Sequence, residues 1–61
     1  MRPQANVILR GGASDGETIF WGDIGSPIRW EDSGGGSVTY TFTDTTENVE
    51  GTNLYVYRVA R

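Results

Sequence analysis

The chemistry open to this 61-residue sequence is narrow, because it contains neither cysteine nor histidine. Without cysteine it can form no disulfide, thiolate zinc site, iron–sulfur cluster or thiol nucleophile. Without histidine it lacks the commonest general base and the commonest metal ligand. Two possibilities remain, an oxygen-only site built from carboxylates or a binding surface.

The carboxylates nearest to a metal-binding pattern are Asp15, Glu17 and Asp23. A calcium loop places carboxylates at several alternate positions and ends on a bidentate acid. The spacing of these three residues does not meet that requirement. We therefore interpret Asp15 as a turn residue and Glu17 as a solvated acid, and we predict no metal and no cofactor.

Glycine-rich segments invite a comparison with phosphate-binding loops. A P-loop needs Gly-Lys-Ser/Thr at the start of a helix, and this chain contains no lysine. We interpret Gly11 and Gly12 as the end of a strand and residues 13–16 as a tight turn of a hairpin, because Asp and Gly accept the left-handed backbone region. Gly34–Gly36 is interpreted as a flexible connection.

The acidic pairs and the serines do not predict a catalytic site either. Glu31-Asp32 and the pair Glu47 and Glu50 lie at expected strand ends or in loops, whereas glycoside hydrolysis needs two acids across a cleft. The serines have no histidine or lysine to act as a base. We predict that the protein is not an enzyme and has no catalytic residues.

Aromatic residues and arginines are the better candidates for function. Tryptophan, tyrosine and arginine dominate the energetics of protein interfaces. The final apolar run alternates so that Tyr55, Tyr57 and Val59 share one face. With Arg58 and Arg29 beside them, they form the candidate protein-binding site.

The charge balance disfavours nucleic acid as a partner. Five arginines against eight acidic residues give a net charge of −3, whereas phosphate backbones select a clustered basic excess. The arginines are scattered singly along the chain. A local patch of Arg10, Arg29 and Arg58 would form only if the fold brought them together.

The elements that must position these residues are strands. The stretch Val38–Thr43 alternates apolar residues with threonine, which is typical of a half-buried strand. Glycine interrupts the rest of the chain too often for a helix. We predict five strands within residues 6–10, 17–21, 28–31, 38–43 and 54–59, with a tail at residues 1–5, a glycine-rich loop at 32–37 and a polar loop at 44–53.

Five short strands in one domain, residues 1–61, predict an all-β fold, an antiparallel five-stranded meander that curls into a partly open barrel. Alternation assigns one set of apolar residues to the core: Val7, Leu9, Ile19, Trp21, Ile28, Trp30, Val38, Tyr40, Phe42, Leu54 and Val56. It assigns a second set to the opposite faces: Ile8, Phe20, Tyr55, Tyr57 and Val59.

So small a domain without a disulfide or a metal is expected to gain stability by association. The final strand is apolar on both faces and would offer an unpaired edge or an exposed patch, so we predict a homodimer formed there. The competing interpretation is a barrel that closes on the first strand and leaves Tyr55 and Tyr57 as scattered surface residues.

The segment Leu9–Thr18, with its Gly-Gly-Ala-Ser-Asp-Gly turn, resembles small proteins of actinobacteria and their bacteriophages. Those proteins begin with an apolar strand and a Gly-Gly-Pro-x-Asp-Gly turn, and they end in a strand rich in Tyr, Phe and Val. This sequence departs from them at Ala13, where they have proline. The resemblance implies a phage or prophage origin, and it implies no activity or catalytic residue.

The function expected from these observations is a phage-type interaction protein that binds itself or a host protein through an aromatic β face. The alternatives are a minor capsid or tail component of a virion and a small barrel associated with nucleic acid. No apolar run approaches the ~20 residues of a membrane span. We therefore expect a soluble protein of the host cytoplasm, or of the virion under the first alternative.

Overall fold

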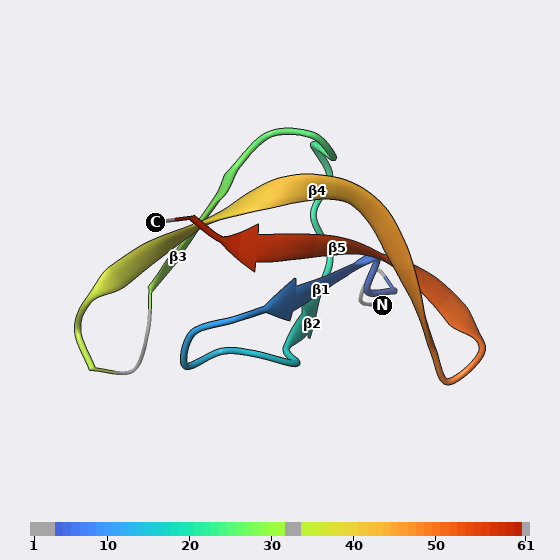
Figure 1. Ribbon diagram of the computed structural model, residues 1–61, viewed down its shortest axis with the longest axis horizontal. Helices are drawn as coiled ribbons and strands as arrows, with labels where there is room; N and C mark the ends of the chain where they lie inside the picture. Colours follow the sequence, from blue (N-terminus) through green and yellow to red (C-terminus); the bar gives the residue numbers. More distant parts are fainter. Residues whose placement is uncertain (1–3, 32–33, 61) are drawn as a thin grey trace.

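The computed structural model describes residues 4–31 and 34–60, and it confirms the all-β prediction (Figure 1). The strands are β1 (Val7–Arg10), β2 (Thr18–Ile19), β3 (Ile28–Glu31), β4 (Ser37–Val49) and β5 (Thr52–Val59). They form a single five-stranded sheet in the order β2-β1-β5-β4-β3. The sheet curls into a half-barrel whose concave side holds the main core.

The expected antiparallel meander is wrong at one pairing, because β1 and β5 run parallel. The chain leaves β2, crosses to the far edge of the sheet in residues 20–27 and returns through β3, β4 and β5. This route places β5 between β1 and β4, at the centre of the sheet (Figure 1). The prediction of an unpaired edge at the final strand is therefore wrong, since β1 covers that edge. The edge strands are β2 and β3.

The polar loop predicted at residues 44–53 is also wrong, because most of it is strand. β4 and β5 form a long hairpin joined by Glu50 and Gly51, both with positive φ, at 50° and 88°. Such turns match the twist of a hairpin. The polar composition reflects a solvated hairpin rather than a loop, since β strands tolerate polar residues on a wet face.

A bulge between Phe42 and Thr46 interrupts the β4–β5 ladder. Asp44 adopts a φ of 61° there. The Thr43 hydroxyl donates a hydrogen bond to the Val56 carbonyl at 2.8 Å. A side chain thus satisfies a carbonyl at a point where the strand pairing is interrupted.

The other two predicted loops fall partly outside the described residues. Residues 1–3 of the tail and residues 32–33 of the glycine-rich loop lie outside them. Gln4 and Ala5 precede β1 without regular structure, as the tail prediction requires. Ser37 already belongs to β4, so the glycine-rich connection ends one residue earlier than predicted.

The assignment of residues to the main core is correct for β1, β3 and β4. In β5 the two faces are reversed, although Leu54 and Val56 are buried as predicted. The buried residues of the concave face are Val7, Leu9, Ile28, Tyr40 and Tyr57. A second, smaller cluster on the outer face contains Ile8, Leu54 and Val56. Tyr57 therefore belongs to the main core, and Leu54 and Val56 lie opposite it. Alternation groups residues by face but cannot choose the inner face when both faces are apolar.

The segment between β2 and β3 closes the mouth of the half-barrel. The amide of Gly25 donates to the Tyr57 hydroxyl at 2.8 Å, and this hydroxyl donates to the Ser26 carbonyl at 3.0 Å. The Asn6 side chain bonds both backbone groups of Trp21, at 2.8 and 2.9 Å. The result is a compact globule of 32 × 27 × 20 Å. In the described part of the chain, no helix has the length and apolar character needed to cross a membrane.

Candidate protein-binding site

The structure divides the five predicted site residues between two faces of the sheet. Tyr57 is wholly buried in the concave core, and Val59 is half-buried against that core. Neither residue offers a partner the exposed aromatic or apolar surface that the sequence suggested. Both residues lie on the face of β5 that packs against the main core.

Tyr55 is the predicted aromatic that stays exposed, with 39% of its surface accessible. It lies at the rim of the half-barrel, edge-on to Phe42 with ring centroids 5.9 Å apart. Phe20 is more exposed, at 52%, and was not among the predicted site residues. With Tyr57 buried, the tyrosines of β5 do not form the exposed aromatic face that we expected.

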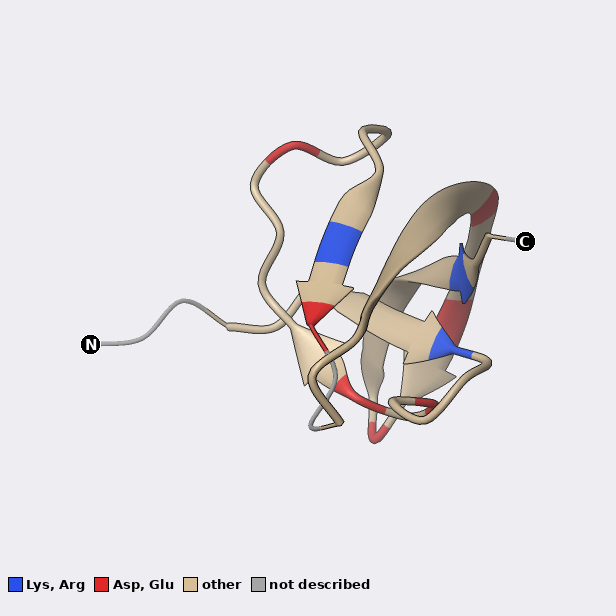
Figure 2. Ribbon diagram, turned by 90° about the vertical axis from the view of Figure 1, so that its left-hand side faces the viewer, with Lys and Arg blue, Asp and Glu red and all other residues tan. Residues whose placement is uncertain are grey.

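Arg29 on β3 and Arg58 on β5 lie on either side of β4, and their registers with Thr39 and Thr41 put both on the outer face of the sheet. Figure 2 shows in blue the positions of arginine along the ribbon. Arg29 is opposite Thr39, and Arg58 is opposite Thr41. Both arginines are exposed, and neither pairs with a carboxylate among residues 4–31 and 34–60. The fold thus brings these two predicted residues to one face and separates them from the tyrosines.

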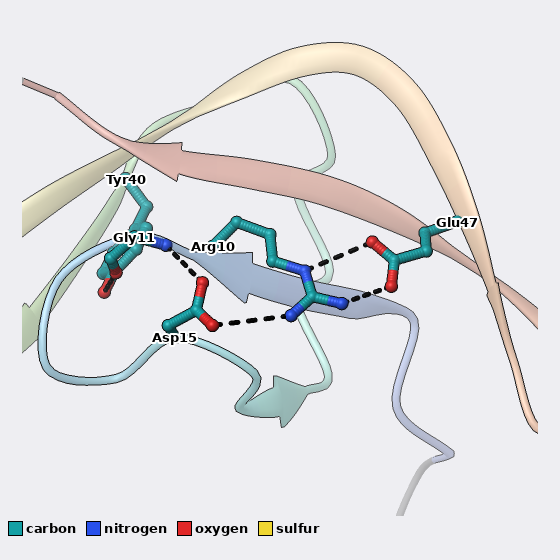
Figure 3. A network of polar contacts seen from close by, with 5 residues as sticks. All are labelled: Arg10, Gly11, Asp15, Tyr40 and Glu47. Atoms are coloured by element: carbon teal, nitrogen blue, oxygen red, sulfur yellow. Dashed lines mark hydrogen bonds and ion pairs between the residues drawn. The ribbon is translucent and has the colours of Figure 1, made fainter.

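Arg10, the third arginine of the possible patch, is committed to ion pairs within the chain (Figure 3). Its guanidinium donates to both carboxylate oxygens of Glu47 on β4 and lies 3.5 Å from Asp15 in the following turn. The hydrogen bond to Glu47 is the main reason why the pKa of Arg10 lies above its usual value. Arg10 fastens β1 to β4, and its charge is neutralised rather than offered to a partner.

The edge strand β3 carries the feature that sequence reasoning missed. The Ala60 amide donates to the Thr39 carbonyl at 2.7 Å, so the Thr39 backbone faces β5. Both polar groups of a residue point to the same side of a strand in an antiparallel ladder. Arg29, directly opposite Thr39, therefore directs its N–H and C=O away from β4, and so does Glu31 by alternation. Within the described ranges, no backbone hydrogen bond from another segment reaches these groups.

Neither a metal centre nor a catalytic cleft emerges from the described residues. No group of three or more acidic side chains among them could hold a metal ion. An open hollow of about 270 Å³ lies between the N-terminal end of β1, β2 and the tip of the β4–β5 hairpin. Glu50 is the single carboxylate among the residues that line it, beside Thr18 and Leu54. One solvated acid supplies no acid–base pair.

Comparisons with family models, curated proteins and solved structures found no match to this chain. The resemblance seen at Leu9–Thr18 therefore stays a prediction.

Proposed function

We propose that this chain is a non-enzymatic interaction protein that binds its own copies or another protein through the edge of its sheet. The observation that supports this proposal is the free edge of β3, where the backbone groups of Arg29 and Glu31 point outward. Unpaired amides and carbonyls on an edge strand are a template for an added strand. Main-chain hydrogen bonds would supply the affinity.

The opposite edge of the sheet is a poorer template. β2 contains two residues, Thr18 and Ile19. The Ile19 carbonyl accepts a hydrogen bond from the Asn6 amide at 2.9 Å, so its backbone faces the first strand segment. Thr18 alone directs its backbone groups outward by alternation. The edge of β3 replaces the aromatic face as the proposed binding surface.

Proline substitution tests the edge with a matched control. Arg29→Pro removes an outward-facing N–H that makes no bond to β4, and proline is tolerated on edge strands. Thr18→Pro makes the same change on the opposite edge. Sedimentation equilibrium at about 10–500 μM and a pull-down from host lysate should show association in the parent and in Thr18→Pro, and loss of it in Arg29→Pro. Association that survives in Arg29→Pro, or a parent chain that associates with nothing, contradicts the proposal.

The setting we propose is a bacteriophage or prophage, and the resemblance of the Leu9–Thr18 turn supports it. A host-directed protein would act in the host cytoplasm, whereas a capsid or tail component would use the same edge to pack within the particle. Mass spectrometry of purified particles separates the two. Detection at a fixed copy number per particle indicates the virion component, and absence indicates the host-directed protein.

A second candidate is nucleic-acid binding, which the exposed Arg29 and Arg58 on one face favour. The net charge of −3 and the neutralisation of Arg10 by Glu47 and Asp15 oppose it. Binding to single-stranded DNA that weakens steeply with salt, and that Arg58→Ala reduces, would support this candidate.

A further inference from the structure

The direction of the backbone groups restricts how a second strand can pair with β3. Arg29 and Glu31 face outward, whereas Trp30 lies opposite Val38 and directs its backbone toward β4. In an antiparallel pair, two residues that exchange both backbone hydrogen bonds must both face the partner strand. If the added strand is β3 of a second copy, the opposed outward residues are therefore Arg29 with Arg29, Glu31 with Glu31, or Arg29 with Glu31.

Charge chooses among these three registers. The first places two arginines directly opposite each other and the second places two glutamates opposite each other, and like charges across a ladder destabilise it. The third places Arg29 opposite Glu31 twice, once on each side of a two-fold axis. Both side chains are exposed and lie on the same outer face of the sheet, so they are available for this pairing. The edge is self-complementary in this register alone.

The two-fold axis of that register passes beside Trp30. Trp30 is half-buried on the inner side of the sheet, and its indole N–H donates to the Ser14 hydroxyl at 2.8 Å. On the axis it would form a non-hydrogen-bonded pair with its own copy, the type of pair in which side chains lie closest. The exposed part of the Trp30 side chain, which the bond to Ser14 holds in place, would then be covered by Trp30 of the second copy.

We propose that the occupant of the β3 edge is a second copy of this chain, paired antiparallel with Trp30 at the two-fold axis and Arg29 opposite Glu31 of the second copy. This inference rests on the proposed function and adds the partner and the register. The two half-barrels then share one continuous sheet. The alternation of charge along β3 is the device that selects this pairing, whereas a single sign of charge would repel a second copy.

Charge reversal tests the register directly. Arg29→Glu places glutamate opposite Glu31, and Glu31→Arg places arginine opposite Arg29. Each variant alone should raise the dimer dissociation constant at least tenfold in sedimentation equilibrium. An equimolar mixture of the two variants should restore association as a heterodimer, because every opposed pair is then oppositely charged. The double variant Arg29→Glu/Glu31→Arg should also restore the homodimer.

Arg58→Glu is the matched control. It makes the same charge change on the same outer face, but on the central strand β5. This variant should dimerise like the parent. Hydrogen exchange measured by NMR gives a second readout, in which the amides of Arg29 and Glu31 gain protection as the protein concentration rises.

The outcomes separate this inference from the proposed function. If Arg29→Pro abolishes association while the charge variants associate like the parent, the proposed edge stands and the register is overturned. If the parent is monomeric throughout and captures a different protein through the edge, the second copy is overturned as the occupant. Loss of association in each single variant, together with restoration in the double variant, supports the register, because the double variant keeps like charges opposed when position 29 faces 29 or position 31 faces 31. Restoration in the mixture shows that both single variants are folded.

Discussion

The hydroxyl of Tyr40 donates a hydrogen bond to the backbone carbonyl of Gly11 at 2.8 Å. Tyr40 is wholly buried on β4, and Gly11 begins the turn that follows β1. Tyr40 lies beside Gly11 at the start of the turn that also presents Asp15 to Arg10 (Figure 3). One buried phenol thus connects β4 to the turn that follows β1, a strand that is not its neighbour in the sheet.

Removal of this hydroxyl should destabilise the fold. In Tyr40→Phe the ring still fills the core, and the Gly11 carbonyl loses its partner. The free energy of unfolding should fall by about 1–2 kcal/mol, the usual range for a hydrogen bond lost at a buried site. Urea denaturation followed by tryptophan fluorescence measures this difference. An unchanged transition midpoint would show that the bond does not contribute.

A comparison of Gly11→Ala with Gly16→Ala distinguishes the cost of backbone strain from the cost of steric crowding. Both have positive φ, at 89° and 91°, so alanine is strained at either position. A Cβ at Gly11 would lie 2.9 Å from Cγ1 of Val59, whereas a Cβ at Gly16 would meet nothing within 4 Å. Gly11→Ala should therefore cost about 1–3 kcal/mol more than Gly16→Ala, as overpacked sites do. Equal losses in thermal denaturation would contradict the close contact between β5 and the turn.

Loss of the hydroxyl should destabilise the fold at Tyr57 and have little effect at Tyr55, the other tyrosine of β5. The Tyr57 hydroxyl bridges the Gly25 amide and the Ser26 carbonyl, so Tyr57→Phe leaves two backbone groups unpaired. We expect a loss of about 1–3 kcal/mol. Tyr55→Phe at the exposed rim should stay within about 0.5 kcal/mol of the parent. A larger loss for Tyr55→Phe than for Tyr57→Phe would contradict the burial of Tyr57 and its hydrogen bonds to Gly25 and Ser26.

Phe42 and Thr41 test the two faces of β4. Phe42 is half-buried and packs on the rings of Tyr55 and Tyr57, at 5.9 and 5.5 Å between centroids. Phe42→Ala should destabilise by about 3 kcal/mol, the lower end for a phenylalanine because the site is not fully buried. Thr41→Ala on the exposed face should change stability by less than about 0.5 kcal/mol. Similar losses measured by urea denaturation would contradict this assignment of faces.

The candidate site was only partly accessible from the sequence. Arg29 and Arg58 are exposed, which the sequence indicates, since an isolated charged residue in an apolar run faces solvent. The sequence could not predict that Arg29 lies in an edge strand, because the position of β3 in the sheet depends on how distant segments pair. The outward backbone groups of Arg29 and Glu31 follow from that position together with the Thr39–Ala60 hydrogen bond.

Strand character was determined locally. The alternation of Val38–Thr43 and the glycines that separate the apolar runs specify extended segments and turns, because side-chain periodicity and backbone freedom act within a few residues. The inner placement of Tyr40 also follows from that periodicity, since threonines form a clear polar face opposite it in β4. Periodicity makes no such choice in β1, where Ile8 is buried like Val7 and Leu9.

The tertiary structure alone decided the order of the strands and the inner face of β5. The parallel pairing of β1 with β5 joins segments almost fifty residues apart in the sequence, and no local pattern encodes such a contact. Leu54 and Val56 compete with Tyr55 and Tyr57 for the interior, and periodicity treats the two sets equally. Tyr57 can be buried in the core because its hydroxyl forms hydrogen bonds with two backbone groups of the segment between β2 and β3. A buried phenol is stable only where such partners exist.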